Sequence, residues 1–192
     1  MKTVLIGGMG NVLLGDDGVG PYLLRLLASR YAFEKGVEIV DLGTPALDLL
    51  HRISKKGSVI LIDSIDIGLP PGAVRLFTKQ EIIRQGGSAR LETHSPALTD
   101  TLLGAEFLGV CPEEVVLVGI QVESLEPGCT LSASVESALP RAMTETLHLL
   151  NRMGIKCHCR QEPEGSGIWW ADAATPKSPL DLRGGAVPTT ID

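Results

Sequence analysis

The sequence predicts an α/β fold of three layers, in which a mostly parallel sheet is covered by helices on both faces. Apolar runs of strand-like length alternate along the chain with segments of helical periodicity, which is typical of repeated strand–helix–strand units. The runs are nearly continuous, as in Val59-Ile60-Leu61-Ile62, and a strand that is buried on both faces requires that composition. Five such runs span residues 2–7, 37–42, 58–63, 73–78 and 114–120.

Helical segments are predicted between and after these runs. Proline is tolerated in the first turn of a helix, and it marks the starts of three segments at Pro21, Pro45 and Pro96. A fourth segment runs from about Ser134 to Met153, and we expect Pro140 to kink it because proline lacks the N–H donor of the helix. The side chains expected to face the core recur at helical spacing: Leu23, Leu26, Leu27 and Tyr31; Leu47, Leu50 and Ile53; Leu98, Leu102, Ala105 and Leu108; and Val135, Leu139, Met143, Leu147 and Leu150.

Length and composition indicate one globular domain followed by a tail. The chain has 192 residues, of which 44% are apolar, and this suits a single core. We assign residues 1–158 to the domain. Residues 159–192 are interrupted by glycines and prolines and have no periodic stripe, so we expect a loosely ordered tail. Trp169-Trp170 within it is interpreted as an incidental exposed pair.

Charge and hydropathy argue against several classes of partner. The net charge is −6 without a Lys/Arg-rich stretch, and 4% of residues are aromatic, so we expect no nucleic-acid binding. We also expect no membrane span, because no run of about 18 apolar residues is free of charges. The N-terminal apolar run is too short for a signal peptide, which predicts a cytoplasmic protein with reduced cysteines.

Three polar residues lie at the predicted carboxyl edge of the sheet, where loops of an open α/β sheet form the functional crevice. Asp17 closes the glycine-rich loop after the first strand, Asp63 is the last residue of the third, and His94 lies in a polar link before a helix. Two carboxylates and one imidazole, with coordination positions left open, suit a divalent metal such as nickel or zinc. A single Asp at a strand end often only caps a turn, and a single His is often structural, so spacing alone leaves both roles open.

Longer motifs surround these residues in a recognisable order. The glycine-rich loop reads Gly8-x-Gly10-Asn11-x-Leu13-x-x-Asp16-Asp17-Gly18-x-Gly20. It is followed by Asp41-Leu42-Gly43-Thr44, by Leu61-Ile62-Asp63-Ser64-Ile65, by His94, and by Val118-Gly119 with Glu123-Ser124-Leu125-Glu126-Pro127 after it. In this combination and order the chain resembles the nickel–iron hydrogenase maturation endopeptidases over residues 1–158.

The resemblance implies an activity and a site. Its family has a twisted five-stranded sheet between helices and removes the C-terminal extension of a hydrogenase large-subunit precursor that is already loaded with nickel. By motif position the nickel ligands and catalytic residues become Asp17, Asp63 and His94, and the metal is expected to arrive with the substrate. Zinc or another divalent ion could occupy the same ligands. The family often has Glu where this chain has Asp17, which has a shorter reach.

The resemblance also implies a substrate-recognition role for Asp41, Gly43 and Thr44. Two mechanisms stay open at this point. The metal acts as a Lewis acid on the scissile carbonyl or on water, or it is only an anchor while Asp17 or Asp63 acts as general base in an aspartic-type endopeptidase.

Other functions fit the sequence less well or use the same residues. A dinucleotide site would need a third glycine where the chain has Leu13, and the acids at positions 16 and 17 would repel a pyrophosphate. Cys157-His158-Cys159 lacks a second ligand pair for a zinc site and is interpreted as a solvated segment after the last helix. A binding module that only inspects a partner's metal would use the same three ligands, so that alternative stays open.

Overall fold

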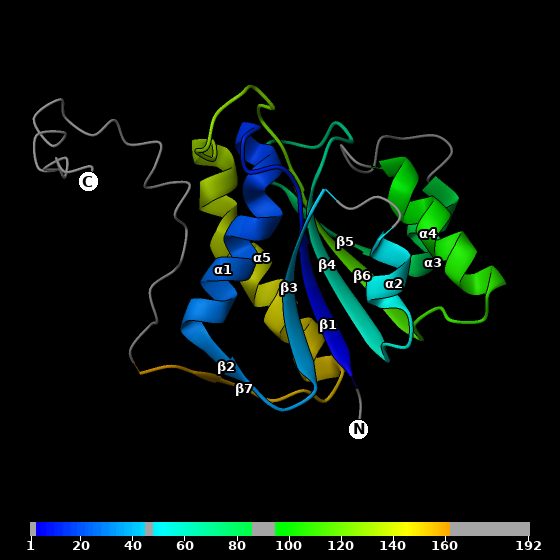
Figure 1. The fold of residues 1–192 in the computed structure, drawn as a ribbon. Coiled ribbons are helices and arrows are strands. Elements are labelled where there is room, and N and C mark those ends of the chain that lie inside the picture. Colours follow the sequence, from blue (N-terminus) through cyan, green and yellow to red (C-terminus); the bar gives the residue numbers. More distant parts are fainter. Residues whose placement is uncertain (1–2, 45–47, 86–94, 162–192) are drawn as a thin grey trace, which may run out of the picture.

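The protein is built around a central β-sheet with helices on both sides (Figure 1). The structure is a computed structural model, and it describes residues 3–44, 48–85 and 95–161. Five strands lie in the order β3-β1-β4-β6-β5, with bounds β1 (Val4–Met9), β3 (Val37–Gly43), β4 (Ser58–Ile65), β5 (Val74–Thr78) and β6 (Glu114–Gln121). All neighbouring pairs are parallel except β5 and β6. The predicted fold class is confirmed.

The antiparallel strand β5 follows from the length of its connection. A parallel return needs a crossover of a dozen or more residues, whereas only residues 66–73 separate β4 from β5. The chain therefore reverses direction, and β5 pairs with the far side of β6. The strand was predicted over residues 73–78, and the observed β5 begins one residue later, at Val74.

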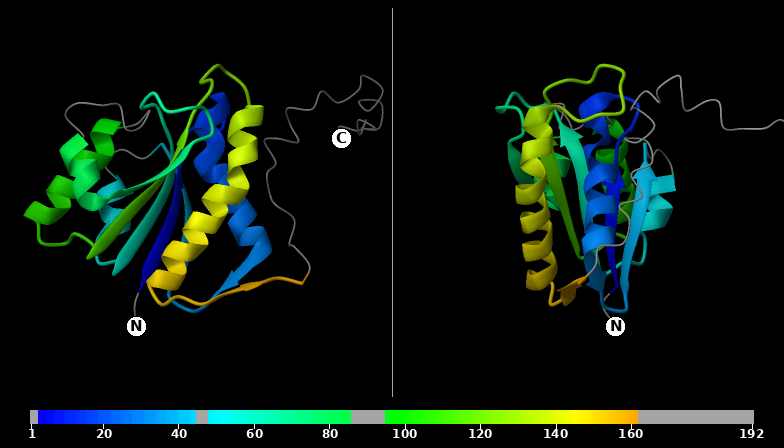
Figure 2. Two further views of the ribbon diagram at one scale, coloured as in Figure 1. Left: turned by 180° about the vertical axis from the view of Figure 1, so that it is seen from behind. Right: turned by 90° about the vertical axis from the view of Figure 1, so that its left-hand side faces the viewer.

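Helices cover both faces of the sheet (Figures 1 and 2). Each face has its own hydrophobic core. One face carries α1 (Val19–Arg30) and α5 (Ala133–Arg152), and the other carries α2 (Asp48–Ile53), α3 (Lys79–Gln85) and α4 (Ser95–Phe107). Alternate residues of β4 enter different cores: Ile60 and Ile62 pack with α1 and α5, and Leu61 packs with the other helices.

Several local predictions are wrong. Tyr31 was expected to belong to a helix, but α1 ends at Arg30 and Tyr31 begins a short strand, β2 (Tyr31–Phe33). Its antiparallel partner is β7 (Cys157–Cys159). That segment follows the last helix, and His158 and Cys159 are exposed as expected, but it forms a strand. Leu108 was expected to face the core but is 60% exposed, because α4 ends one residue earlier.

The last helix begins and ends close to its predicted limits. The side chain of Ser132 caps it by accepting a hydrogen bond from Val135 N at 3.3 Å. Pro140 lies on its exposed side, and the helix continues through it. The predicted tail lies outside the described residues from position 162 onward.

None of the helices within the described ranges is both long enough and apolar enough to cross a bilayer.

Candidate active site

Two of the predicted site residues, Asp17 and Asp63, have buried carboxylates at the carboxyl edge of the parallel strands. Asp17 lies in a short 3-10 helix, η1 (Gly15–Gly18), which joins the loop after β1 to the start of α1. Asp63 lies near the end of β4, the neighbour of β1 in the sheet. The two residues are 1% and 0% exposed, respectively. A buried carboxylate must be compensated by hydrogen-bond donors, so their partners define what the site can do.

Two donors from different parts of the chain hold Asp17. Its Oδ2 accepts a hydrogen bond from the backbone N–H of Asn11 at 2.8 Å, and its Oδ1 accepts one from the hydroxyl of Ser64 at 2.7 Å. Hydrogen bonds to a carboxylate are shorter and stronger than those between neutral groups. They fix the plane of this carboxylate relative to β4.

Ser64, the next residue along β4, also donates a hydrogen bond to Asp63. Asp63 Oδ1 accepts this hydrogen bond from the backbone N–H of Ser64 at 2.8 Å. Side chains alternate along a strand, so Asp63 shares a face with Leu61 and Ser64 shares the other face with Ile62. This explains how Ser64 reaches η1 with its side chain while its backbone stays beside Asp63.

The third predicted ligand, His94, lies outside the described residues. The structure therefore brings Asp17 and Asp63 to one edge of the sheet and does not place His94. Within residues 3–44, 48–85 and 95–161 there is no group of three or more His, Cys, Asp or Glu side chains that could hold a metal.

Sequence reasoning missed the role of Asp16. Its carboxylate accepts hydrogen bonds from Glu123 N (2.8 Å), Ser124 N (3.0 Å), Ser132 N (2.6 Å) and Ser132 Oγ (2.9 Å). The residue is 1% exposed. Asp16 thereby joins η1 to the loop between β6 and α5. The sequence signal for this contact was that the adjacent acids Asp16 and Asp17 occur together with the motif at 123–127. In the sequence, that combination indicated only a resemblance to the family.

Two glycines of the motif are needed for the backbone to pass close to this site. Gly10 has φ 131°, and a Cβ atom there would lie 1.8 Å from the carbonyl oxygen of Asp17. A Cβ atom on Gly20 would lie 2.1 Å from the carbonyl oxygen of Met9 and 2.4 Å from that of Ile62. Any larger residue would separate α1 from β1 and β4 and displace Asp17.

The segment predicted to recognise substrate adjoins this loop. Asp41 Oδ1 accepts a hydrogen bond from Gly43 N at 3.0 Å, which forms a tight turn at the end of β3. Gly43 has φ 58° with open space around it, and its carbonyl accepts a hydrogen bond from Gly10 N at 2.7 Å. Asp41 and Thr44 are exposed. An exposed turn is thus attached directly to the loop that carries Asp17.

The same geometry argues against a dinucleotide site. In such a site, backbone N–H groups of the glycine-rich loop bind a pyrophosphate. Here the N–H of Asn11 already donates to the carboxylate of Asp17, so an anion of the protein itself holds that donor.

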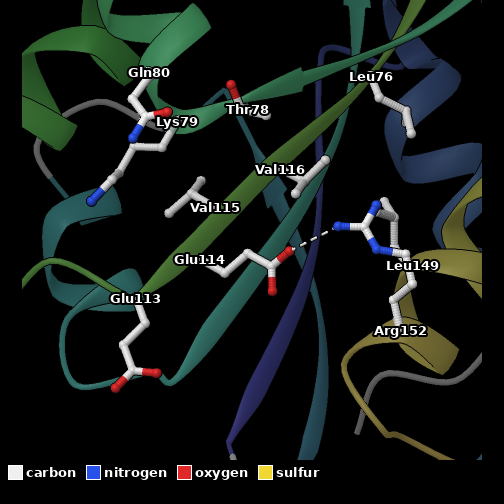
Figure 3. A pocket seen from close by; sticks show the side chains of 10 residues that line it. All are labelled: Leu76, Thr78, Lys79, Gln80, Glu113, Glu114, Val115, Val116, Leu149 and Arg152. Carbon is white, nitrogen blue, oxygen red and sulfur yellow. Dashed lines mark hydrogen bonds and ion pairs between the residues drawn. The ribbon is translucent and has the colours of Figure 1, made fainter.

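A pocket of about 220 Å³ lies elsewhere, at the amino end of β6 (Figure 3). Leu76, Val116 and Leu149 supply apolar walls, and Arg152 lies 3.5 Å from Glu114 across its opening. Since β6 is parallel to β4, this pocket is at the edge of the sheet opposite to Asp63. It contains none of the predicted site residues.

The fold and the candidate site together define a class: a three-layer α/β protein with buried carboxylates at the carboxyl edge of its sheet. Residues 21–149 match the family model described as hydrogenase maturation protease. The hydrogenase expression/formation protein HoxM of Azotobacter vinelandii is 34% identical over 159 residues, which cover 82% of this chain and 77% of that protein. The protein belongs to the hydrogenase maturation protease family.

Solved structures and a further relative agree with this assignment. The hydrogenase maturating endopeptidase HybD from Escherichia coli superposes with a TM-score of 0.78 at 30% identity, covering 82% of this chain and 98% of that one. The hydrogenase maturation protease HybD from Thermococcus kodakarensis gives 0.63 at 28% identity, covering 77% and 98%. The hydrogenase 2 maturation protease of E. coli K12 is 29% identical over 82% of this chain and 96% of its own length. The protein is therefore an enzyme, a hydrolase acting on peptide bonds.

Proposed function

We propose that this enzyme removes the C-terminal extension of a nickel-loaded nickel–iron hydrogenase large-subunit precursor and recognises the substrate's nickel through Asp17, Asp63 and His94. The observation that carries the proposal is the pair of buried carboxylates held by donors at the carboxyl edge of the sheet. Family membership supplies the reaction class, because the family matures hydrogenases.

The donor set is suited to such an ion. Carboxylate oxygens with one imidazole favour a divalent borderline metal over ions that seek thiolates. Each carboxylate oxygen has two lone pairs, so an oxygen that accepts one hydrogen bond can still approach a cation. Three protein ligands leave coordination positions for ligands from the precursor, and zinc should be able to substitute for nickel.

Two mechanisms remain, and they differ in whether the metal or a carboxylate of the protein activates the attacking water or the scissile bond. In the first, the nickel polarises the scissile carbonyl or activates water, and the ligands only hold it. In the second, the nickel anchors the precursor, and Asp17 or Asp63 takes the proton from the attacking water, as in an aspartic-type endopeptidase. Both need the carboxylates oriented as they are.

The turn at the end of β3 supports a role in substrate binding. Asp41 and Thr44 are exposed, and the open space at Gly43 allows a peptide backbone to approach closely. The partner in this proposal is the large-subunit precursor, with neither nucleic acid nor a membrane involved. A cytoplasmic location is proposed with it, and the four free cysteines, Cys111, Cys129, Cys157 and Cys159, suit a reducing compartment.

The test is cleavage of matched precursors. Nickel-loaded precursor should lose its extension when incubated with the purified enzyme, and nickel-free precursor under strict chelation should stay intact. His94→Ala and Asp17→Ala should abolish cleavage of the loaded form while their circular dichroism matches that of the unaltered enzyme. Efficient cleavage of the nickel-free precursor would overturn metal recognition and leave ordinary acid–base hydrolysis.

A further inference from the structure

Ser64 contacts both carboxylates of the candidate site. Its backbone N–H donates to Asp63 Oδ1 at 2.8 Å, and its hydroxyl donates to Asp17 Oδ1 at 2.7 Å. Ser64 is itself completely buried. A buried hydroxyl oriented toward a carboxylate of the site acts on the orientation of that carboxylate.

The geometry fixes Asp17 from two sides. Ser64 donates to Oδ1, and the N–H of Asn11 donates to Oδ2. The terminal torsion of an Asp side chain is broad, so without such donors the plane of the carboxylate could turn over a wide range. The donor from Asn11 belongs to the backbone of the glycine-rich loop, whereas the donor from Ser64 is a side chain on the rigid central strand β4.

We propose that Ser64 is a positioning residue, whose hydroxyl orients Asp17 toward the metal carried by the substrate while its N–H holds Asp63. This inference rests on the proposed function, because it takes Asp17 as a ligand of that metal. It adds a residue that contacts neither the metal nor the peptide and acts through both ligands. The hydroxyl is the part that a substitution can remove, since the backbone N–H remains in any variant.

The test compares Ser64→Ala with a matched control. Ser29→Ala removes another buried serine hydroxyl, which donates to Leu26 O at 3.0 Å within α1, away from the site. For each variant three quantities are measured: kcat/KM on nickel-loaded precursor, the Kd of the isolated enzyme for Zn²⁺ by calorimetry, and the Kd for nickel-free precursor. The melting temperature is recorded as well.

Ser64→Ala should lower kcat/KM and weaken Zn²⁺ binding by about ten-fold each, the size expected for one hydrogen bond to a charged group. Its Kd for nickel-free precursor should match that of the unaltered enzyme, because docking away from the metal does not involve the hydroxyl. Ser29→Ala should leave all three quantities unchanged. If Ser64→Ala does not fold, Ser64→Cys keeps the side-chain volume with only a weak donor and replaces it in the same measurements.

Two outcomes overturn the inference. Unchanged kcat/KM and Zn²⁺ affinity in Ser64→Ala would show that Asp17 is oriented without the hydroxyl. A parallel loss of affinity for the nickel-free precursor would show that Ser64 supports the fold in general. Asp17→Ala, measured alongside, separates these results from failure of the proposed function: if that variant cleaves loaded precursor normally, Asp17 is not a ligand.

Discussion

At the scale of single residues, two adjacent acids have different roles. Asp16 accepts four hydrogen bonds from the loop that precedes α5 and is a structural clamp. Asp17 accepts hydrogen bonds from Asn11 and Ser64 and adjoins the strand that carries Asp63. The difference comes from the 3-10 turn, which points successive side chains in different directions.

Asp63→Asn should abolish processing. The amide keeps the shape of the carboxylate but loses the charge that holds a divalent cation. We therefore expect activity to fall by at least about a thousand-fold, or about 4 kcal/mol, which exceeds the roughly 1 kcal/mol of an ordinary hydrogen bond. Precursor cleavage, measured as the mass lost from the large subunit, gives the rate.

Asp66→Asn is the matched control for that substitution. Asp66 is exposed and accepts a hydrogen bond from Gln121 Nε2 at 3.1 Å, which an Asn side-chain oxygen can also accept. Its activity should stay close to that of the unaltered enzyme. Equal behaviour of the two variants would show that the strand-end acid has been assigned wrongly.

At the scale of elements, the candidate site lies beside a junction of two loops. The loop after β1 and the loop before α5 are joined by the carboxylate of Asp16 and by backbone hydrogen bonds between Gly15 N and Gly128 O and between Gly128 N and Leu13 O. These segments are more than a hundred residues apart in the sequence. The position of Asp17 is therefore set by the β6–α5 connection as well as by its own loop.

Asp16→Asn should destabilise the fold by about 3 kcal/mol. An amide can accept through one oxygen only, and its NH₂ group would face backbone donors, so buried donors would lose their partners. Thermal and urea unfolding measure this change. Asp48→Asn is the control, because Asp48 forms an exposed ion pair with Arg52 at 3.4 Å that contributes little. A stability of Asp16→Asn equal to that of the control would contradict the clamp.

The short helix α3 begins with a capping motif that is visible in the sequence. Thr78 and Glu81 form a capping box: Thr78 N donates to Glu81 Oε2 at 2.8 Å, and Glu81 N donates to Thr78 Oγ1 at 3.3 Å. The backbone N–H of Thr78 holds the pKa of Glu81 below its ordinary value. The Thr-x-x-Glu spacing is visible in the sequence, but the helix is too short to show a periodic apolar stripe.

At the scale of the whole molecule, the end of the described chain near residue 160 packs back against the end of α1 and β2. β7 pairs with β2, and Arg160 N donates to the carbonyl of Arg30, the last residue of α1, at 2.8 Å. The sheet, both helical layers and both carboxylates precede this point in the sequence. We therefore expect the domain to fold without the glycine- and proline-rich segment.

Truncation after residue 160 should leave a folded and active enzyme. The variant keeps β7 and the hydrogen bond from Arg160, so we expect the melting temperature to fall by no more than a few degrees. Calorimetry and the processing assay on nickel-loaded precursor test this. Insolubility, or a larger fall in melting temperature, would show that Trp169-Trp170 packs on the domain.

The sequence by itself determined the layered fold, the reaction class and the edge of the sheet at which Asp17 and Asp63 lie. Hydrophobic runs such as Val59–Ile62 indicate strands buried on both faces, because a strand covered by helices on each side needs apolar side chains in both directions. The acids follow strands whose carboxyl ends must meet at one edge of a parallel sheet. These properties need only the order of the elements and the character of their residues.

Only the tertiary structure decided which donors hold those acids. Ser64 meets Asp17 across 47 positions of sequence, and Asp16 meets Ser132 across 116. Such contacts depend on the register between β1 and β4 and on the close packing of α1 that Gly20 allows. A hydrogen bond is lost when its donor and acceptor shift by a few tenths of an ångström or turn away from each other, whereas hydrophobic packing is not directional and tolerates such shifts. The composition of the sequence therefore cannot specify which donors hold the acids.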